Sequence, residues 1–298
     1  TLLAAELAGG ADAVARALPA AVSVELIHNF SLIHDDIEDG DEERHHRQTL
    51  WRVWGQPQAI NTGDALFALA RWRLLDLARL GVDAALTLRL IALVDATCLE
   101  LCEGQHLDMS FEARREVSVA MYLDMIARKT AALMRCSTTL GARVGAPEDE
   151  ALGERLGAFG QALGLAFQLR DDLLGIWQAR ELGKSAAGDV RRKKMSLPVI
   201  HALEHASEAD RDALTAIYFA PGPASDEQIA EALAILDRSG ARARVHDVLR
   251  EQLDQARAAL AAALALAQAR PANDAQSAAE AGAALGEFIA YISADAGA

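Results

Sequence analysis

Residues 20–39 read AAVSVELIHNFSLIHDDIED, and this stretch decides the fold. Its apolar residues recur on nearly all sides of a helix: Val22, Val24, Leu26, Ile27, Phe30, Leu32 and Ile33. A helix that is apolar all round is typical of a central position in a large helical bundle. Residues 160–176 have the same character. We therefore expect both segments to be central helices.

The rest of the chain is rich in Ala and Leu, which favour helix, and the alternating pattern of strands is absent. Expected helices cover residues 61–80, 84–102, 117–144, 197–204, 226–239, 241–269 and 284–292. A helix over residues 11–18 is expected to end before Pro19, because proline suits the first turn of a new helix. No shift in composition marks a linker, so the prediction is one all-α domain over residues 1–298 with roughly ten helices.

Composition excludes several classes of protein. The chain has 298 residues, 52% of them hydrophobic, and a net charge of −14, which indicates a globular protein and argues against a nucleic-acid surface. Cys98, Cys102 and Cys136 form no disulfide framework and indicate a reducing cytoplasm. The most apolar run, residues 258–267, is too short to span a membrane. The chain begins at Thr1 without a Met, so we expect that residues precede it.

The first cluster of charge lies where the apolar stretch ends. Seven of the nine residues 35–43 are acidic: Asp35, Asp36, Glu38, Asp39, Asp41, Glu42 and Glu43. Asp35 and Asp39 are four residues apart, so they share a helix face and repel each other unless a cation lies between them. His28 and Ser31 lie on the same stripe.

A second pair of aspartates, Asp171 and Asp172, follows the other apolar segment, and Gln168 shares a helix face with Asp172. Buried charges of this kind are unfavourable unless they are paired or bind metal. Carboxylate donors without His or Cys favour a hard cation such as magnesium, which leaves positions for water and substrate phosphate. The two clusters therefore predict half of a site that a polyanion completes.

Basic residues are scarce but gather at residues 44–47, at Arg128 and Lys129, and at residues 184–194. Residues 183–189 contain glycine and Lys184 but lack the spacing of a P-loop. Taken with the aspartates, these cations predict a diphosphate held by magnesium on one side and by Lys and Arg on the other.

On these motifs the sequence resembles the trans-isoprenyl diphosphate synthases, the polyprenyl synthase family. Residues 31–39 resemble its first aspartate-rich motif, DDxxD, in the short form. Residues 167–172, followed by Gly183, Lys184 and Asp189, resemble the second. The similarity runs from residue 2 to residue 201, with Lys129 and Thr130 between the motifs. It implies the all-α isoprenoid synthase fold around a central apolar cavity, in a homodimer.

The resemblance also implies the roles of individual residues. Three Mg²⁺ ions would bridge Asp35, Asp39 and Asp171 to an allylic diphosphate. The residues implied to be catalytic are Asp35, Asp36, Asp39, Asp171, Lys129 and Lys184. Those implied to bind the substrates are His28, Arg44, His45, Lys129, Thr130, Gln168, Lys184 and Lys194, of which His28 and His45 fall on the side of isopentenyl diphosphate.

The implied reaction needs no nucleophilic side chain. Cations stabilise the departing diphosphate and leave an allylic carbocation in a dry apolar cavity. The double bond of isopentenyl diphosphate attacks that cation, and a proton is then lost to the released diphosphate. Consistently, the sequence shows no Ser-His-Asp or Cys-His pattern.

Three departures from the family pattern stand out. His45 replaces the second arginine of the family's RRGxPT segment, where Arg47 is a nearby cation. Gly175 stands where many members have a third aspartate, and we expect activity to survive this. The family's GKxxR segment would fall just before Thr1.

Product length follows from where the cavity closes. Phe30 resembles the bulky floor of geranylgeranyl diphosphate synthases with the short motif, and Ser31 leaves space below Asp35. We expect a twenty-carbon product first and a fifteen-carbon product next. The alternatives are a noncatalytic subunit of a heteromeric synthase, which tends to lose aspartates, and a class I terpene cyclase, which needs neither His28 nor Lys129 with Thr130.

Overall fold

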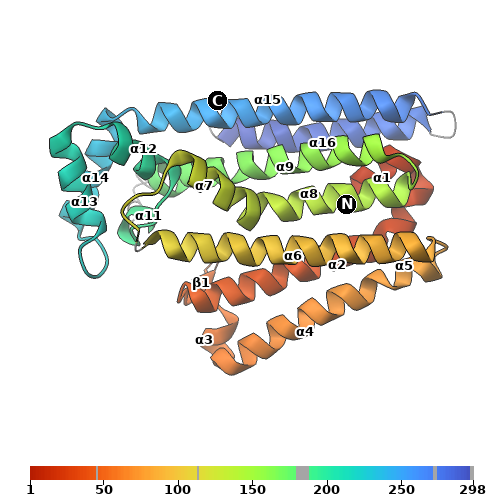
Figure 1. Cartoon of the computed structure of the whole chain (residues 1–298), viewed down its shortest axis with the longest axis horizontal. Helices are drawn as coiled ribbons and strands as arrows, with labels where there is room; N and C mark the ends of the chain where they lie inside the picture. Colours follow the sequence, from red (N-terminus) through yellow and green to blue (C-terminus); the bar gives the residue numbers. More distant parts are fainter. Residues whose placement is uncertain (45, 113, 179–187, 271–273, 296–298) are drawn as a thin grey trace. The chain divides into compact units, whose positions relative to one another are not determined.

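The computed structural model describes residues 1–44, 46–112, 114–178, 188–270 and 274–295. These residues are helical almost throughout (Figure 1). The strands among them are β1 (Glu43–Arg44) and β2 (Arg47–Gln48), which form one antiparallel pair. The predicted all-α class is therefore confirmed. Within the described ranges, no helix has both the length and the apolar character needed to cross a membrane.

The chain divides into two compact units. Unit 1 consists of Thr1–Cys102, Ala132–Gly160 and Ala258–Gly286, and unit 2 consists of Glu103–Ala131, Gln161–Arg257 and Glu287–Ala298. The boundaries fall inside helices α6, α9, α15 and α16, so each of these helices contributes residues to both units. The single domain expected over residues 1–298 stays a prediction.

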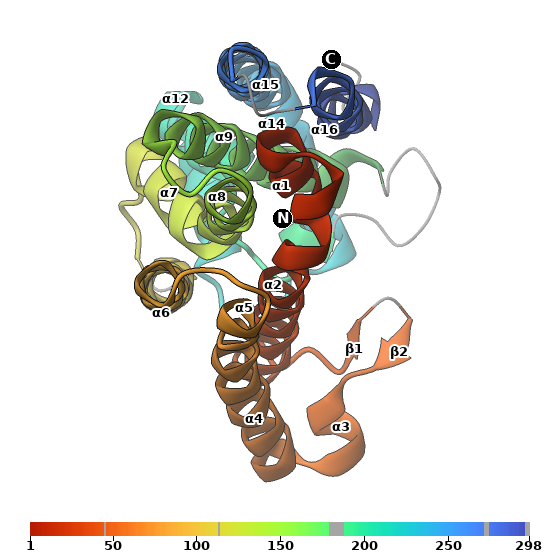
Figure 2. The same cartoon turned by 90° about the vertical axis from the view of Figure 1, so that its right-hand side faces the viewer.

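Unit 1 contains the first charged cluster. Its elements are α1 (Leu2–Gly9), α2 (Ala11–Glu38), α3 (Leu50–Trp54), α4 (Gln56–Leu74), α5 (Asp76–Arg79), α8 (Ala132–Gly145), the first parts of α6 (Ala84–Glu112), α9 (Glu150–Leu173) and α16 (Ala275–Asp295), and the end of α15 (Ala241–Gln268). Helix α4 lies along α2, and the β1–β2 hairpin and α3 connect them (Figure 2). The buried core of this unit includes Ile27, Leu74, Leu90 and Leu140.

Helix α2 does not break at Pro19, so the expectation that a new helix begins there was wrong. An internal proline removes one helical hydrogen bond and destabilises a helix by about 3 kcal/mol. The apolar stripe of Ala13, Ala17, Ala20 and Ile27 stays buried on both sides of Pro19, and this continuous packing offsets the loss. The helix is also less enclosed than its apolar pattern over residues 20–39 predicts, because Val22 is 38% exposed.

Unit 2 contains the second charged cluster. Its elements are the end of α6, α7 (Val119–Ile126), η1 (Ala127–Ala131), the end of α9, η2 (Leu174–Gln178), α11 (Gly188–Arg191), α12 (Leu197–His205), α13 (Glu208–Tyr218), α14 (Asp226–Arg238), most of α15 and the end of α16. Both η1 and η2 are π-helical turns. The helix expected over residues 117–144 is therefore interrupted at Ala127–Ala131, and α13 lies in a stretch where no helix was expected.

Helix α1 packs against α8 through small residues. A Cβ atom added at Gly145 would lie 2.5 Å from the carbonyl oxygen of Ala5 and 2.9 Å from the Cβ atom of Ala8. The two helices can approach this closely because residue 145 has no side chain.

We predict that Gly145→Ala lowers the free energy of unfolding by about 1–3 kcal/mol, because α1 must move away from α8. Thermal unfolding measures the change. Gly286→Ala is the control: a Cβ atom there has no neighbour within 4 Å. That substitution should stabilise the chain by roughly 0.5–1 kcal/mol, because alanine favours helix. Equal melting temperatures for the two variants would contradict the packing role of Gly145.

Candidate active site

The first cluster occupies the C-terminal end of α2. Asp35 is half-buried, Asp36 is 6% exposed, and Asp39 is the C-terminal cap and is exposed. The last turn of α2 contains no basic residue. The C-terminal end of a helix carries partial negative charge, so carboxylates gathered there are unfavourable without a cation. This end of α2 is therefore suited to bind positive charge.

Asp36 is neutralised within the protein. Its Oδ1 atom accepts a hydrogen bond of 2.8 Å from Nε of Arg44, which lies on β1. Burial raises the pKa of Asp36, and the Arg44 guanidinium opposes that rise. The carbonyl oxygen of Asp41 accepts bonds from Thr49 and Trp51, which fix the turn that carries Arg44. The structure thus brings the predicted residues Asp36 and Arg44 together as a pair.

The predicted floor residue Phe30 belongs to an aromatic cluster between α2 and α4. Its ring centroid lies 5.5 Å from that of Phe67 and 5.5 Å from that of His34. Phe30 itself is half-buried. Ser31 donates a hydrogen bond of 2.9 Å to the carbonyl oxygen of His28, whose side chain is exposed.

The second cluster, in unit 2, contains one half-buried and one fully buried aspartate. Asp171 is half-buried, whereas Asp172 is 1% exposed. Asp172 accepts a short hydrogen bond from the hydroxyl of Tyr122 and one of 3.3 Å from Nε2 of Gln168. Burial raises the pKa of Asp172 to about 6, and Lys194 and Tyr122 oppose the rise. Burial likewise raises the pKa of Asp171.

Lys129 and Thr130 lie in the π-helical turn η1 and bond to different helices. Nζ of Lys129 lies 2.5 Å from Oδ2 of Asp108 on α6. The hydroxyl of Thr130 donates a bond of 2.9 Å to Oε1 of Gln168 on α9. The structure therefore joins residues from three separate stretches of sequence into one polar network.

Lys194 belongs to the same acidic neighbourhood. Burial acts to lower its pKa, but the negative charges of Asp172, Asp189 and Asp108 outweigh burial and raise that pKa. Lys194 thus stays charged while it is half-buried. Unit 2 brings together all of the predicted residues Lys129, Thr130, Gln168, Asp171 and Lys194.

Tyr122 is a site residue that the sequence analysis missed. Its side chain is fully buried, and burial together with the Asp172 carboxylate raises its pKa far above the ordinary value, so it acts as a hydrogen-bond donor. Its spacing of seven residues from Lys129 was a usable signal, because that spacing places two residues on one face of a helix.

The structure gives a physical reason for the missing third aspartate. A Cβ atom at Gly175 would lie 2.3 Å from Oδ2 of Asp189. The carboxylate of Asp189 therefore occupies the space beside η2 that a side chain at residue 175 would need. Glycine at residue 175 permits this position of Asp189, whereas an aspartate there would force the Asp189 carboxylate to rotate away and would place a second negative charge beside it.

Two predicted residues, His45 and Lys184, lie outside the described residues. In the part of the chain that is described, no group of three or more His, Cys, Asp or Glu side chains is arranged to hold a metal ion. Asp35 and Asp39 belong to unit 1 and Asp171 to unit 2. Their carboxylate oxygens are the donors that magnesium prefers, so the residues fit this ion by their chemistry. The metal set stays a prediction.

Unit 1 also contains a cavity of about 510 Å³ that is separate from the predicted site residues. Leu86, Leu90 and Leu93 of α6 supply apolar side chains to its wall, and Arg89 and Arg143 line it as well. No residue of either aspartate pair lines it.

The all-α fold therefore carries two acidic helix ends, and the half-buried cations Lys129 and Lys194 belong to the neighbourhood of the second. The chain belongs to the polyprenyl synthetase family, whose model matches residues 1–236. It is 40% identical over 257 residues to a short chain isoprenyl diphosphate synthase of Methanothermobacter thermautotrophicus; the match covers 86% of this chain and 76% of that protein.

Two proteins of Mycobacterium tuberculosis are 44% identical to the chain. One is a (2E,6E)-farnesyl diphosphate synthase, matched over 79% of this chain and 64% of its own length. The other is a geranylgeranyl diphosphate synthase, matched over 80% of this chain and 66% of its own length. The chain thus spans slightly less than two thirds of these two relatives.

Solved structures of the family have the same fold as this chain. A polyprenyl synthetase from Streptomyces coelicolor A3(2) has a TM-score of 0.82 and 39% identity over 97% of this chain and 82% of that chain. A geranylgeranyl pyrophosphate synthase from Corynebacterium glutamicum, complexed with isoprenyl diphosphate and magnesium, has a TM-score of 0.78 and 26% identity over 97% of this chain and 83% of that chain.

We predict that Gly175→Asp, which restores the usual third aspartate, lowers the free energy of unfolding by about 1–3 kcal/mol, because two carboxylates would compete for one space. Thermal unfolding measures the loss. In Gly175→Asp/Asp189→Ala the space is vacated, and the melting temperature should recover. Gly188→Ala is the control, since a Cβ atom at Gly188 has no neighbour within 4 Å. A Gly175→Asp variant as stable as the original chain would refute the steric explanation.

Proposed function

We propose that this protein is a trans-prenyltransferase that condenses isopentenyl diphosphate with an allylic diphosphate in a magnesium-dependent reaction. The observation that carries the proposal is the pair of aspartate clusters at the ends of α2 and α9, with Lys129 and Lys194 in the network of the second cluster. Relatives of the chain named farnesyl and geranylgeranyl diphosphate synthase support it.

In this proposal the acidic side chains bind the metal ions and the basic side chains bind the diphosphate. Asp35, Asp39 and Asp171 would hold three magnesium ions, which supply positive charge to the diphosphate that departs. Lys129, Lys184 and Lys194 bind the diphosphate oxygens, as does Arg44, which Asp36 orients. Thr130 and Gln168, already hydrogen-bonded to each other, orient the same group. His28 and His45 bind isopentenyl diphosphate.

The reaction follows from this arrangement of charge. The bond between the allylic carbon and oxygen breaks, and its electron pair leaves with the diphosphate. The double bond of isopentenyl diphosphate then attacks the allylic cation and forms the new carbon–carbon bond. A proton leaves the product for the released diphosphate. Site cations lower the barrier because they are already oriented toward the charge that develops.

The aromatic cluster supports a geranylgeranyl product, with farnesyl as the next candidate. Phe67 and His34 contact the ring of Phe30, so the proposed floor is held by a second helix. Arg71 adds a cation–π contact on Phe67, 5.9 Å from the ring centroid, and pairs with Asp95 on α6. Because these contacts hold Phe30 in place, its ring would stop the prenyl chain of the product from growing past it.

The proposal also includes a homodimeric assembly and a cytoplasmic location. Large apolar side chains are exposed on α4, just after α5, and on α6 of unit 1, including Ile60, Trp72, Leu80 and Leu88. Exposed apolar side chains in such number are typical of interaction surfaces, which supports a homodimer. None of Cys98, Cys102 and Cys136 forms a disulfide, which supports a cytoplasmic location.

We predict that Asp35→Ala and Asp171→Ala each lower kcat by roughly a thousandfold, because each would remove a carboxylate that holds magnesium. The assay supplies magnesium, isopentenyl diphosphate and each allylic diphosphate in turn, and chromatography separates the dephosphorylated products. Glu38→Ala, an exposed acid in the same run, is the control and should keep its activity.

The original chain tested alone separates the alternatives. Hydrocarbon formed from geranylgeranyl diphosphate without isopentenyl diphosphate would indicate a cyclase. Complete inactivity that a second subunit restores would indicate a noncatalytic partner.

We predict that Phe30→Ala lengthens the product, because removal of the ring opens the floor of the cavity. Phe67→Ala should lengthen it less, since Phe30 would stay but lose its support. Phe288→Ala, at a half-exposed position on α16, is the control. Chromatography of the products measures the shift, and an unchanged product from Phe30→Ala would rule out this floor.

A further inference from the structure

The π-helical turn η1 presents two neighbouring residues to two different helices. Lys129 contacts Asp108 on α6, and Thr130 contacts Gln168 on α9. A π-helical turn holds one residue more than an α-helical turn and is rarely stable alone, so surrounding structure must support it. All the residues that support η1 in the account below belong to unit 2.

Gly104 of α6 provides the first support. A Cβ atom there would lie 2.3 Å from the backbone nitrogen of Lys129, 2.6 Å from its Cα and 2.8 Å from the carbonyl carbon of Arg128. All three are backbone atoms, which cannot rotate away as the end of a side chain can. Helix α6 therefore contacts the backbone of the turn directly, and only a glycine permits this.

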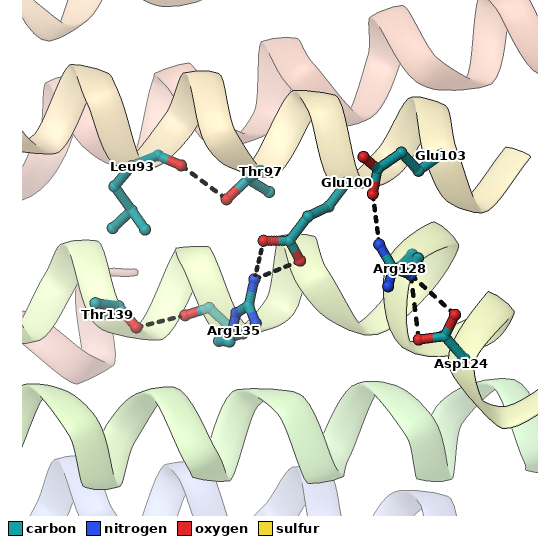
Figure 3. A network of polar contacts seen from close by, with 8 residues as sticks. All are labelled: Leu93, Thr97, Glu100, Glu103, Asp124, Arg128, Arg135 and Thr139. Carbon is teal, nitrogen blue, oxygen red and sulfur yellow. Dashed lines mark hydrogen bonds and ion pairs between the residues drawn. The ribbon is translucent and has the colours of Figure 1, made fainter. Parts of the chain in front are cut away.

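Arg128 provides the second support, as Figure 3 shows. Its Nη1 atom donates a bond of 2.5 Å to Oε2 of Glu103, and its Nε atom donates bonds of 3.0 and 3.1 Å to the carboxylate of Asp124. The guanidinium thus ties η1 to α6 and to the preceding helix α7. Glu103, Gly104 and Asp108 contact the turn at successive points along α6.

We propose that Glu103, Gly104 and Arg128 form a brace that positions Lys129 and Thr130 for binding of the substrate diphosphate. The inference rests on the proposed function. Arg128 and Glu103 are positioning residues in it, since they act through the turn. Partly exposed ion pairs contribute little to folding, so the brace should affect binding more than stability.

The pair Glu100–Arg135 is a matched control. Arg135, on α8, donates bonds of 2.6 and 2.7 Å to Glu100 on α6 (Figure 3). This pair lies in unit 1, and its arginine matches Arg128 in exposure, 36% for Arg135 against 37% for Arg128, whereas Glu100 is 33% and Glu103 58% exposed. It joins α6 to a helix beyond the π-helical turn and holds no predicted site residue.

The experiment compares Glu103→Gln, Arg128→Gln and their double variant with Glu100→Gln and Arg135→Gln. The original chain and each variant are assayed for KM and kcat with the allylic diphosphate, for the Kd of inorganic pyrophosphate with magnesium by calorimetry, and for melting temperature. The brace predicts that Glu103→Gln and Arg128→Gln each weaken both binding constants about tenfold or more, because small displacements of binding groups have large effects. The double variant should be little worse than either single one, since the pair acts as a unit. The control variants should leave both constants unchanged.

The sign of the Glu103→Gln effect separates the brace from a simple charge effect. Removal of a negative charge near the site would strengthen binding of a diphosphate if only long-range charge mattered. Weaker binding supports the brace, and unchanged or stronger binding overturns it. Gly104→Ala should also weaken binding; if it fails to fold, Glu103→Gln still decides.

The proposed reaction and the brace can fail separately. If the original chain binds pyrophosphate without condensing substrates, and Glu103→Gln weakens that binding, the brace stands and the proposed reaction falls. If the original chain is active and Glu103→Gln leaves KM and Kd unchanged, the brace falls and the reaction stands. A chain that neither binds pyrophosphate nor turns over substrate overturns both.

Discussion

Negative charge concentrated at the C-terminal end of α2 is the constraint on which the candidate site depends. Asp35, Asp36 and Asp39 gather where the helix itself presents negative partial charge, and no basic residue lies in that last turn. Within the described residues, Arg44 on the following hairpin offsets the charge of Asp36. Carboxylates gathered in this way are the kind of site that a multivalent cation binds, and this is the reason for proposing magnesium there. The composition of the site therefore follows from one electrostatic problem.

The two aspartate pairs are built in the same way, although they lie in separate units. In each pair the second aspartate is buried and bonded within the protein: Asp36 to Arg44, and Asp172 to Tyr122 and Gln168. The first aspartate, Asp35 or Asp171, is half-buried and is the one proposed to bind metal. Adjacent residues on a helix point in different directions, so one carboxylate can anchor the helix end while its neighbour faces a ligand. A buried acid that is fully hydrogen-bonded also keeps the helix end rigid, which suits a site that must hold its ligands in place.

Much of the fold and of the site was predictable from local patterns. Ala-rich and Leu-rich segments placed most of the helices, because helix propensity and apolar spacing act over a few turns. The predicted residues Lys129, Thr130, Gln168, Asp171 and Lys194 do converge in unit 2. The errors arose where distant packing outweighs local preference. Pro19 lies inside α2 because a buried stripe runs past it, and the helix expected over residues 117–144 contains a π-helical turn because α6 contacts that turn at Gly104.

The sequence by itself determined the all-α class, the two acidic helix ends and the identity of the charged residues around them, since all of these depend on residue type and short spacing. Only the tertiary structure decided which partner each charge has. It paired Asp36 with Arg44, buried Tyr122 against Asp172, and set Asp189 in the space that Gly175 leaves. These pairings join residues 8, 50 and 14 positions apart, and spacing along a helix says nothing about them. They depend on how the hairpin and the helices pack, which is decided by burial over the whole unit.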